Sequence, residues 1–432
     1  MKIAVVGLGY VGVPVAAAFA DAGFDVVGID IEPAKVEAIK NGRSPLEGEE
    51  PGLAELVARA ASSGRLRASG SYSECDGAEF VIVAVETPID DVTHDPQFRA
   101  LRSALSALGP HLKRGAIVSI ESTVAPGTIS GLVKPVLEKR SGMREGRGFH
   151  VVHCPERVTS GKLLHNLYNL DRVLGGRSRK ATRTAAAVYE KILKGTIHVT
   201  DWITAEISKT AENAYWDVQL AFANELALIC EELGANAYRV RELVNTSPYR
   251  AVLVPGTGVG GHCIPKDPWL LVSRSVQMKP VLIPAAREIN EFMPRRTAHL
   301  AEEALRASGR RVKGARIAVL GLTYKEDTDD CRNSPALVVV RELRRRGADV
   351  RIHDPHARSV RGYDVLRDLD AAVRGVDAVV VATAHTAYRK INWTRVGRLV
   401  RRKVLVDGRN LVDGVAFVRR GWVYRGIGKG RF

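Results

Sequence analysis

Short hydrophobic runs alternate with segments of helical periodicity in the first third of the chain. The runs cover residues 3–9, 24–30, 79–85 and 115–123, and each has the length and β-branched content of a buried strand. Strands that alternate with helices predict a parallel sheet covered on both faces.

The last third repeats this pattern. Hydrophobic runs lie at 316–322, 348–354, 377–383 and 403–409, and a helical stretch lies around 336–346; the first three runs match the first three of the earlier half strand by strand. We therefore predict an α/β fold with two doubly wound, Rossmann-like parallel-sheet domains, one at each end of the chain.

A long helix is predicted between the two halves. Thr200 or Asp201 can cap its start, Gly234 can end it, and at ~1.5 Å per residue it spans about 50 Å. It is apolar on more than one face, which fits either burial within the chain or contact with the same helix of a second subunit in a homodimer. The predicted domains are a first Rossmann-like domain over 1–200, a central helical domain over 201–300 with this connecting helix, and a second Rossmann-like domain over 301–432.

Composition places the chain among folded globular proteins. It has 432 residues, of which 45% are hydrophobic and 26% charged. Five cysteines with no CxxC pair argue against a disulfide framework or a zinc site, and no apolar run reaches transmembrane length. We expect a cytoplasmic protein with no metal and no membrane partner.

The net charge of +16 lies entirely in the last 127 residues. Residues 306–432 contain 29 Lys and Arg against 13 Asp and Glu, whereas the remainder is neutral. Such an excess of positive charge can bind nucleic acid, a membrane surface or a small polyanionic ligand. The alternative is an Arg-rich surface that is only solvated. Because Arg344, Arg345 and Arg346 have no aromatic residues among them, we expect no nucleic-acid partner.

A dinucleotide fingerprint follows the first run. Residues 7–12, GLGYVG, match GxGxxG between a predicted strand and helix, and Asp30 ends the second strand. The glycines let backbone amides approach a pyrophosphate, and Asp30 can accept hydrogen bonds from ribose hydroxyls. An acid at this position repels a 2′-phosphate, so NAD is favoured over NADP.

The matching turn in the last third differs. Gly321 is followed by Leu322, Thr323, Tyr324 and Lys325, so two glycines are missing and a lysine is present. Together with Arg409 after a later strand, Lys325 suits a different phosphorylated ligand, for which we infer a nucleoside diphosphate. A plain surface charge is the alternative for each of the two.

A glycine-rich segment at 255–268, PGTGVGGHCIPKDP, carries the candidate nucleophile. Glycines such as Gly258 and Gly260 permit close backbone approach to a ligand, and Cys263 follows directly. Lys266 lies three residues further on and favours a thiolate at Cys263. For His262 we expect packing or local hydrogen bonding.

Lys209 and Asn213 are four residues apart on the predicted long helix and share one face. Because Glu206 and Glu212 are nearby, one interpretation is that this face is exposed to solvent. The other is that the cation of Lys209 and the amide of Asn213 together stabilise an oxyanion.

Six motifs in this order resemble the UDP-glucose/GDP-mannose dehydrogenase family, the UDP-sugar 6-dehydrogenases. They cover essentially the whole chain: GLGYVG, ESTVAPGT at 121–128, PER at 155–157, the helix with Lys209 and Asn213, GVGGHCIPKDP, and GLTYKEDTDDCRNSP at 321–335.

The resemblance implies a four-electron oxidation of a sugar C6 alcohol to a carboxylate with two NAD. Lys209 and Asp267 are the candidate bases for the alcohol proton, and Lys209 with Asn213 steadies the oxyanion. Cys263 forms a thiohemiacetal and then a thioester. Glu156, aided by Thr123, serves the hydrolysis.

Binding residues carry over by motif. Those implied for NAD are Gly7, Leu8, Gly9, Tyr10, Val11, Gly12, Asp30, Lys35, Thr87, Pro88, Ser122, Thr123, Val124, Lys266 and Arg332. Those implied for the UDP-sugar are Glu156, Arg157, Lys209, Asn213, Arg250, Gly258, Gly260, Tyr324, Lys325 and Arg409, with Arg250 reaching a neighbouring subunit's sugar.

Departures from the UDP-glucose branch indicate the substrate. Arg157 follows Glu156, Ser160 replaces a second glutamate, and GGHC replaces GGSC. The sequence looks closer to the UDP-N-acetylhexosamine branch, with UDP-N-acetyl-D-mannosamine first, UDP-N-acetyl-D-glucosamine second and UDP-glucose as a further alternative. A two-electron β-hydroxyacid dehydrogenase and a non-enzymatic nucleotide- or nucleic-acid-binding protein are the rivals of other classes.

Overall fold

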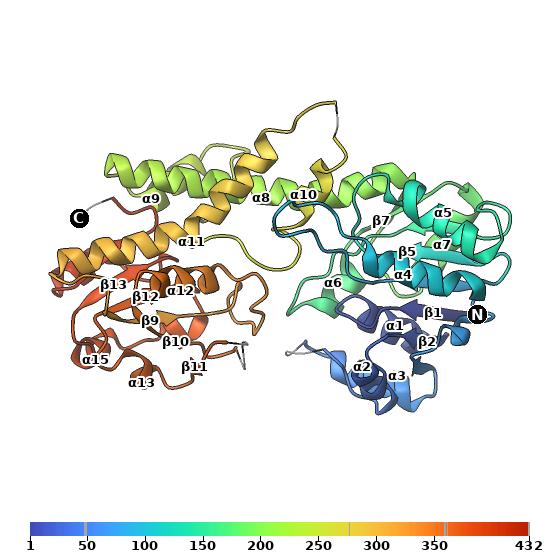
Figure 1. Ribbon diagram of the computed structural model, residues 1–432, viewed down its shortest axis with the longest axis horizontal. Helices are drawn as coiled ribbons and strands as arrows, with labels where there is room; N and C mark the ends of the chain where they lie inside the picture. The colour runs from blue at the N-terminus through green and yellow to red at the C-terminus, as the bar shows by residue number, and fades with distance from the viewer. Residues whose placement is uncertain (47–49, 276, 358–359, 361, 431–432) are drawn as a thin grey trace. The chain divides into compact units, whose positions relative to one another are not determined.

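The computed structural model describes residues 1–46, 50–275, 277–357, 360 and 362–430. The chain divides into two compact units (Figure 1). The first unit comprises Met1–Glu212 and Trp269–Lys279, and the second comprises Asn213–Pro268 and Pro280–Phe432. The three predicted domain ranges stay a prediction.

The first unit is built on an eight-stranded sheet in the order β3-β2-β1-β4-β5-β6-β7-β8. Neighbouring strands are parallel except β6 and β7, which are antiparallel, so the sheet is not parallel throughout. The strands are β1 (Lys2–Val6), β2 (Asp25–Ile29), β3 (Leu66–Ser69), β4 (Phe80–Val83), β5 (Ile117–Ile120), β6 (His150–His153), β7 (Arg172–Gly176) and β8 (Ile197–Thr200).

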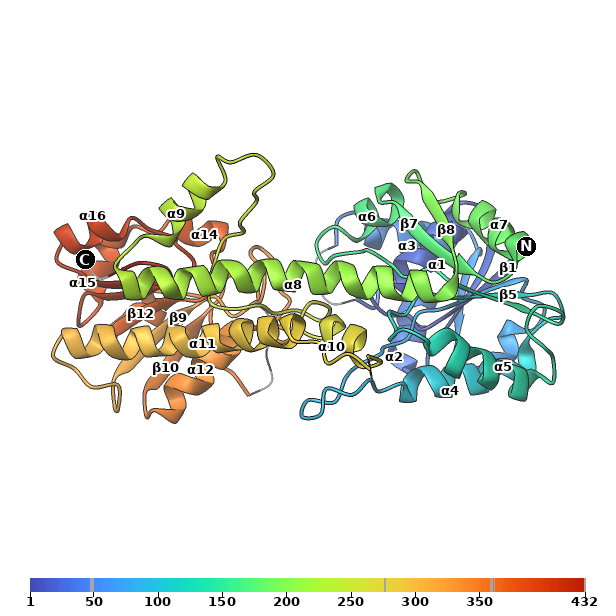
Figure 2. The ribbon, with the colours of Figure 1, turned by 90° about the horizontal axis from the view of Figure 1, so that it is seen from above.

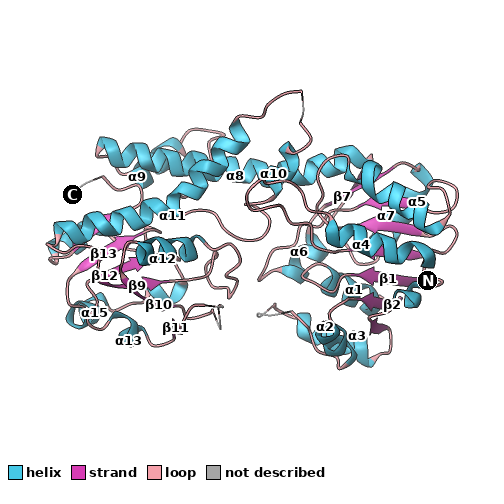
Figure 3. Ribbon diagram, viewed as in Figure 1, coloured by secondary structure: helices cyan, strands magenta, loops and turns pink. Residues whose placement is uncertain are grey.

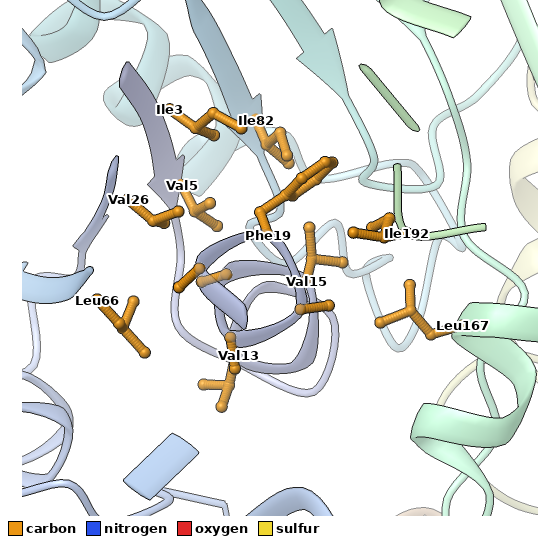
Figure 4. Close-up of a cluster of buried hydrophobic side chains, with 14 of the residues drawn as sticks. Ile3, Val5, Val13, Val15, Phe19, Val26, Leu66, Ile82, Leu167 and Ile192 are labelled. Atoms are coloured by element: carbon orange, nitrogen blue, oxygen red, sulfur yellow. The ribbon is translucent and has the colours of Figure 1, made fainter. Parts of the chain in front are cut away.

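Helices cover both faces of this sheet, as its hydrophobic runs predict (Figure 3). One core packs α1 (Gly12–Asp21), α3 (Leu53–Ser62), α6 (Leu163–Asn169) and α7 (Arg179–Tyr189) against the strands. The other face packs against α4 (Arg99–Leu108) and α5 (Lys134–Ser141), and α2 (Pro33–Lys40) follows β2. Figure 4 shows Phe19 and Val15 of α1 beside Ile82 and Ile192 in the first core.

The second unit contains a six-stranded parallel sheet in the order β11-β10-β9-β12-β13-β14. The central order β10-β9-β12 corresponds to β2-β1-β4 of the first sheet, which confirms the predicted repeat. The strands are β9 (Arg316–Leu320), β10 (Asp349–His353), β11 (Val365–Leu366), β12 (Ala378–Val381), β13 (Val404–Asp407) and β14 (Val423–Gly426).

Two helical layers also cover this sheet. One face packs against α9 (Ala237–Val244), α11 (Leu282–Ala307) and α12 (Pro335–Arg345). The other face packs against α13 (Leu369–Val373), α14 (Thr386–Arg389), α15 (Trp393–Leu399) and α16 (Gly414–Arg419). The short helix α10 (Asp267–Val272) begins within the last two residues of the glycine-rich segment.

The predicted long helix is α8 (Trp202–Leu233), a single helix of 32 residues (Figure 2). Its start is capped by Asp201, whose Oδ1 accepts a hydrogen bond from Thr204 N at 2.9 Å, and Gly234 follows its end with φ of +75°. Cys230 is buried on it, and burial raises the pKa of this thiol, as expected for an inert cysteine. No described helix is both long and apolar enough to cross a membrane.

Candidate active site

The turn after β1 is shaped for close approach of a ligand to the backbone. Gly7 has φ of +95°, and a Cβ there would lie 2.5 Å from Ala84 O. A Cβ on Gly12 would lie 1.8 Å from Gly7 O, so both positions require glycine. Around Gly9 the described structure leaves at least 4 Å of free space for a Cβ. These features fit a dinucleotide pyrophosphate, which would sit at the N-terminus of α1 beside Leu8.

Asp30 closes this turn after β2. Its Oδ2 accepts from Leu8 N at 2.7 Å and its Oδ1 from Glu32 N at 2.9 Å, while Lys35 Nζ lies 3.8 Å from Oδ2. Asp30 is buried but not completely, with 8% of the residue exposed. Of the neighbouring turn residues, Tyr10 and Val11 are partly buried against the core.

The turns after β4 and β5 are tied to each other. Thr87 Oγ1 donates to Thr123 O at 2.6 Å, and Ser122 Oγ donates to Val85 O at 2.6 Å. Val124 is buried beside them and Pro88 is half-buried. The sequence-predicted residues at the carboxyl ends of β1, β2, β4 and β5 therefore share one edge of the first sheet.

Glu206 of α8 corrects one expectation. The sequence suggested that it lies on a solvated face, but it is 1% exposed. Its Oε2 accepts from Gly127 N and its Oε1 from Ile129 N, both at 2.7 Å. A single carboxylate thus satisfies two backbone donors of the segment that begins with Ser122 and Thr123.

Glu156 and Arg157 follow β6 in the same unit. Glu156 is 7% exposed and accepts a hydrogen bond from Val158 N through Oε2. Arg157 donates from Nε to Glu212 Oε2 at 2.9 Å and from Nη1 to Asp171 O at 2.8 Å. Arg157 is therefore held by protein groups, whereas the sequence indicated only a substrate contact.

Sequence reasoning missed a buried polar group close to Glu156. Glu121 is fully buried, its Oε2 lies 3.5 Å from Arg172 Nη1, and its Oε1 accepts from Tyr189 OH at 2.6 Å. Burial raises the pKa of Glu121, and the charge of Arg172 only partly offsets that rise. The one sequence signal was an acid at the end of a strand that is otherwise buried.

In the second unit the glycine-rich segment packs against the turn that follows β9 and the turn that follows β13. Gly258 has φ of +133°, and a Cβ on Gly260 would lie 2.7 Å from Tyr324 Cβ and from Asn333 O. Gly261 N donates to Arg332 O at 3.1 Å. The structure thus brings Gly258, Gly260 and Tyr324 together, as their joint assignment to one substrate site requires.

Arg409 belongs to the same cluster. Thr257 Oγ1 donates to Gly408 O at 3.2 Å, and a Cβ on Gly256 would lie 2.6 Å from Arg409 Nη1. Arg409 also pairs with Glu326 Oε1 at 3.2 Å. Lys325, the neighbour of Glu326, is half-buried, and its carbonyl accepts from Thr323 Oγ1 at 2.9 Å.

Cys263 is half-buried at the end of the glycine-rich segment, and a buried charged group lies behind it. Asp267 is fully buried, with its Oδ1 2.5 Å from Lys266 Nζ and its Oδ2 2.5 Å from Asn213 Nδ2. Asp267 N donates to Cys263 O at 2.9 Å and Lys266 N donates to the same oxygen at 3.0 Å, so the backbone of Cys263 is tied to these two residues. Lys209, one turn before Asn213 on α8, is 7% exposed, so neither residue lies on a solvated face.

His262, Arg250 and Arg332 complete the sequence predictions. Burial, then Lys266 and Arg332, lowers the pKa of His262, which fits a neutral packing residue. Arg332 forms a bidentate pair with Asp330, including 2.5 Å between Nη2 and Oδ2. Arg250 is exposed, with Nη1 3.1 Å from Pro248 O. The cofactor roles of Lys266 and Arg332 stay predictions.

The basic excess mostly lies away from these groups. Five segments, which include the ends of some helices, lead into β9, β10, β12, β13 and β14 and contain 13 Lys and Arg against two Asp: 310–315, 344–349, 374–377, 398–403 and 419–422. Because the strands are parallel, these segments share the amino edge of the sheet. Lys325 and Arg409 follow β9 and β13 at the carboxyl edge, so only a small part of the charge excess serves the candidate substrate site.

Comparison with known proteins places the chain in a family. Three profiles of the UDP-glucose/GDP-mannose dehydrogenase family match it: the NAD-binding domain at residues 1–193, the central domain at 203–292 and the UDP-binding domain at 318–414. The chain belongs to this family. It is accordingly an NAD-dependent dehydrogenase.

Individual relatives match over the full length. The UDP-N-acetyl-D-mannosamine dehydrogenase of Pyrococcus horikoshii is 41% identical over 430 residues, which cover 100% of both chains. The solved structure of the UDP-D-ManNAc dehydrogenase from Pyrococcus horikoshii matches with a TM-score of 0.92, covering 99% of each chain. The NDP-N-acetyl-D-galactosaminuronic acid dehydrogenase of Methanosarcina mazei is 36% identical, with a TM-score of 0.88 and coverage of 99% and 95%.

Proposed function

We propose that this enzyme oxidises the C6 alcohol of UDP-N-acetyl-D-mannosamine to a carboxylate and consumes two NAD per sugar. The observation that carries the proposal is the half-buried Cys263 backed by the buried Lys266, Asp267 and Asn213. A single oxidation to an aldehyde needs no such nucleophile, whereas oxidation to an acid through a thioester does. The choice of sugar is supported by a relative that is named for this substrate and is 41% identical to this chain over its full length.

The first oxidation needs a base for the alcohol proton. Lys209 and Asp267 are the candidates, and Asp267 is held in place by Lys266 and Asn213. NAD, when bound, accepts one hydride in each of the two oxidations. The glycines at 7, 9 and 12 and Asp30 would hold it, with Lys35, Thr87, Pro88 and Ser122 to Val124 around it.

Cys263 then joins the sugar covalently. Its thiolate adds to the aldehyde carbon and the oxygen takes a proton, which gives a thiohemiacetal; loss of hydride and of that proton gives a thioester. Lys209 and Asn213 stabilise the oxyanion that forms when the thiolate adds. Water finally cleaves the thioester, with Glu156 as the base and Thr123 as its helper.

The nucleotide is assigned to the second unit. The clustered Gly258, Gly260, Tyr324 and Arg409, together with Lys325, present backbone amides and two cations, which suits a diphosphate. Arg157 and Ser160 favour an N-acetylhexosamine over glucose, as in the sequence comparison. UDP-N-acetyl-D-glucosamine is the second candidate and UDP-glucose the third.

A homodimer through α8 is part of the proposal. Several large apolar side chains of this helix are exposed in the single chain, among them Ile203, Ile207, Trp216, Phe222, Ile229 and Leu233. Exposed apolar side chains repeated along one helix are typical of a surface that packs against another subunit. The exposed Arg250 would then contact the sugar of the other subunit.

A cytoplasmic location fits the five cysteines, all described and none in a disulfide.

The stoichiometry of NADH tests the proposal. Purified enzyme with saturating NAD and a limiting amount of each UDP-sugar should form two NADH per UDP-N-acetyl-D-mannosamine and the corresponding uronate. One NADH per sugar would contradict the thioester route. A higher kcat/KM for another UDP-sugar would reassign the substrate and leave the route intact.

A further inference from the structure

Arg172, at the start of β7, is a buried cation to which the proposed reaction gives no role. Its side chain is 2% exposed, and its Nη1 lies 3.5 Å from Glu121 Oε2. Glu121 is anchored on its other side by Tyr189 OH, which in turn lies 2.8 Å from Ser119 Oγ. A buried ion pair repays little of its desolvation cost, so stability alone does not account for this arrangement.

The segment that follows β6 runs beside the start of β7. The antiparallel pair β6–β7 joins Val152 to Gly176 and His153 to Gly175, and β6 ends at His153. Beyond that end, Arg157 Nη1 donates to Asp171 O at 2.8 Å. Glu156 and Arg172 are the chain neighbours of these two hydrogen-bonded residues, so both belong to the same part of the first unit.

The charges around Arg172 include that of Glu156. Burial lowers the pKa of the Arg172 guanidinium, but negative charges outweigh burial and raise the pKa overall; Glu121 contributes most, and Glu156 is one of the smaller contributors. Its Nη2 is buried and has no hydrogen-bond acceptor among the residues that the structure describes. One buried guanidinium therefore pairs with the buried Glu121, interacts electrostatically with the buried Glu156, and has a donor left over.

We propose that Arg172 is a positioning residue that holds Glu156 ionised and oriented for hydrolysis of the thioester. The inference rests on the proposed function, because it concerns the base of that hydrolytic step. A planar guanidinium offers two parallel donors to a carboxylate, and it interacts with the ionised form far more strongly than with the acid.

Water adds to the thioester carbon while Glu156 takes one of its protons, and the carbonyl oxygen becomes an oxyanion. The oxyanion re-forms the double bond, the carbon–sulfur bond breaks and Cys263 leaves as a thiolate. The sugar is released as its carboxylic acid, which ionises in water. Arg172 favours the form of Glu156 that can accept the proton.

The test compares Arg172→Met, Arg172→Lys and Arg177→Met. Arg177 is the matched control, since it follows the same strand but is exposed, with its Nη1 4.0 Å from Glu145 Oε2. Rapid mixing with NAD and UDP-sugar measures the first two NADH and the later steady rate, and mass spectrometry measures the adduct on Cys263.

Arg172→Met should give a normal burst of two NADH, followed by turnover slower by about ten- to a hundredfold, with the adduct accumulating on Cys263. Loss of the nearby positive charge raises the pKa of Glu156, so the acid limb of the hydrolysis rate should move to higher pH. Arg172→Lys keeps the charge and should fall between wild type and Met. Arg177→Met should behave as wild type.

A folded Arg172→Met enzyme with the wild-type hydrolysis rate and acid limb would overturn the inference. Should Arg172→Met not fold by circular dichroism, Glu121→Gln gives the second reading. This change removes the charge of Glu121, so the positive charge of Arg172 interacts with Glu156 alone. The acid limb of the pH dependence of the hydrolysis rate should then move to lower pH, and an unmoved limb would overturn the inference. Failure of the wild type to form two NADH with any UDP-sugar contradicts the proposed function instead.

Discussion

The two sheets carry the same acid at the same place, and only one of the two acids remains accessible. Asp30 follows β2 and accepts from Leu8 N at 2.7 Å, and Asp354 follows β10 and accepts from Leu322 N at 2.6 Å. Asp30 is 8% exposed, whereas Asp354 is fully buried. The shared bond holds the first turn of each sheet, so it reflects the fold and not the ligand.

A histidine accounts for the difference. His385 follows β12 at the position that Thr87 takes after β4, and its Nε2 lies 3.1 Å from Asp354 Oδ2. Thr323, in the place of Gly9, lies 3.2 Å from the same nitrogen through Oγ1. The acid of the second sheet is therefore covered by side chains where the first sheet has an open glycine turn.

The same histidine lies in a group with Asp327 and His356 whose potential metal-ligand atoms are all within 4.8 Å. Its Nδ1 accepts from Asp327 N at 2.9 Å, and its Nε2 is engaged by Asp354. Both ring nitrogens thus have protein partners, which is why we keep the expectation that no metal is required. An acid after the second strand indicates a ribose site only when the adjoining turn leaves it accessible.

Cys263→Ser should separate the two sheets' functions most strongly. We expect NAD affinity to stay unchanged, because the glycine turn and Asp30 belong to the first sheet. Acid formation should fall on the order of a thousandfold or more, since a serine alkoxide is scarce at neutral pH. Calorimetry with NAD and a uronate assay measure the two effects. Normal two-NADH turnover would contradict the assignment of Cys263 as the nucleophile.

Asp354→Asn should cost more stability than Asp30→Asn, because only Asp354 is fully buried with a histidine partner. We expect a loss of about 3 kcal/mol for Asp354 and about 1 kcal/mol for Asp30 in the free energy of unfolding, measured with urea.

Acid should also act through Asp354. Burial opposes ionisation, but His385 and then the Leu322 amide outweigh it, so the pKa of Asp354 lies well below its usual range. A lowered pKa gives stability that is present above the unfolded value of about 3.9 and is lost as the pH falls below it. As the pH falls from 5 to below the unfolded value, the free energy of unfolding of the wild type should decrease more than that of Asp354→Asn. The expected difference between the two decreases is about 1 to 2 kcal/mol. Parallel curves for the two proteins would contradict this explanation.

The sequence predicted much of this architecture because hydrophobic runs and glycine turns are local signals. The strands around Gly7, the match between the two halves and the limits of α8 were all confirmed. The antiparallel step between β6 and β7 was missed, because strand direction depends on a distant partner. Glu206 and His385 acquire their roles from residues 31 to 79 positions away, and Arg172 pairs with Glu121, 51 positions away; no spacing rule points to such contacts.

The variants Lys325→Ala and Arg409→Ala test whether the carboxyl edge of the second sheet binds the nucleotide. We expect each to raise the KM for the UDP-sugar about ten- to a hundredfold, because a charge-assisted contact contributes about 1.5 to 3 kcal/mol. NAD affinity should not change. Arg419→Ala, an exposed residue of the amino edge, is the matched control and should leave both constants unchanged. Equal UDP affinity in all variants would mean that the carboxyl edge does not bind the nucleotide.

Asp30→Ala and Asp30→Asn should sharpen the comparison with the smallest effect. Both variants remove the charge that opposes a 2′-phosphate, so both should narrow the preference for NAD over NADP, with NAD affinity falling about tenfold. Only Asp30→Ala removes the acceptor for Leu8 N, since the Asn amide oxygen can still take that bond. The Ala variant should therefore also lose about 1 to 2 kcal/mol of stability that Asn retains. Binding titrations with both dinucleotides and urea unfolding measure the two effects separately. If Asp30→Asn keeps the wild-type discrimination against NADP, the accessible carboxylate of the first sheet does not select the cofactor, and the difference in exposure between Asp30 and Asp354 has no consequence for binding.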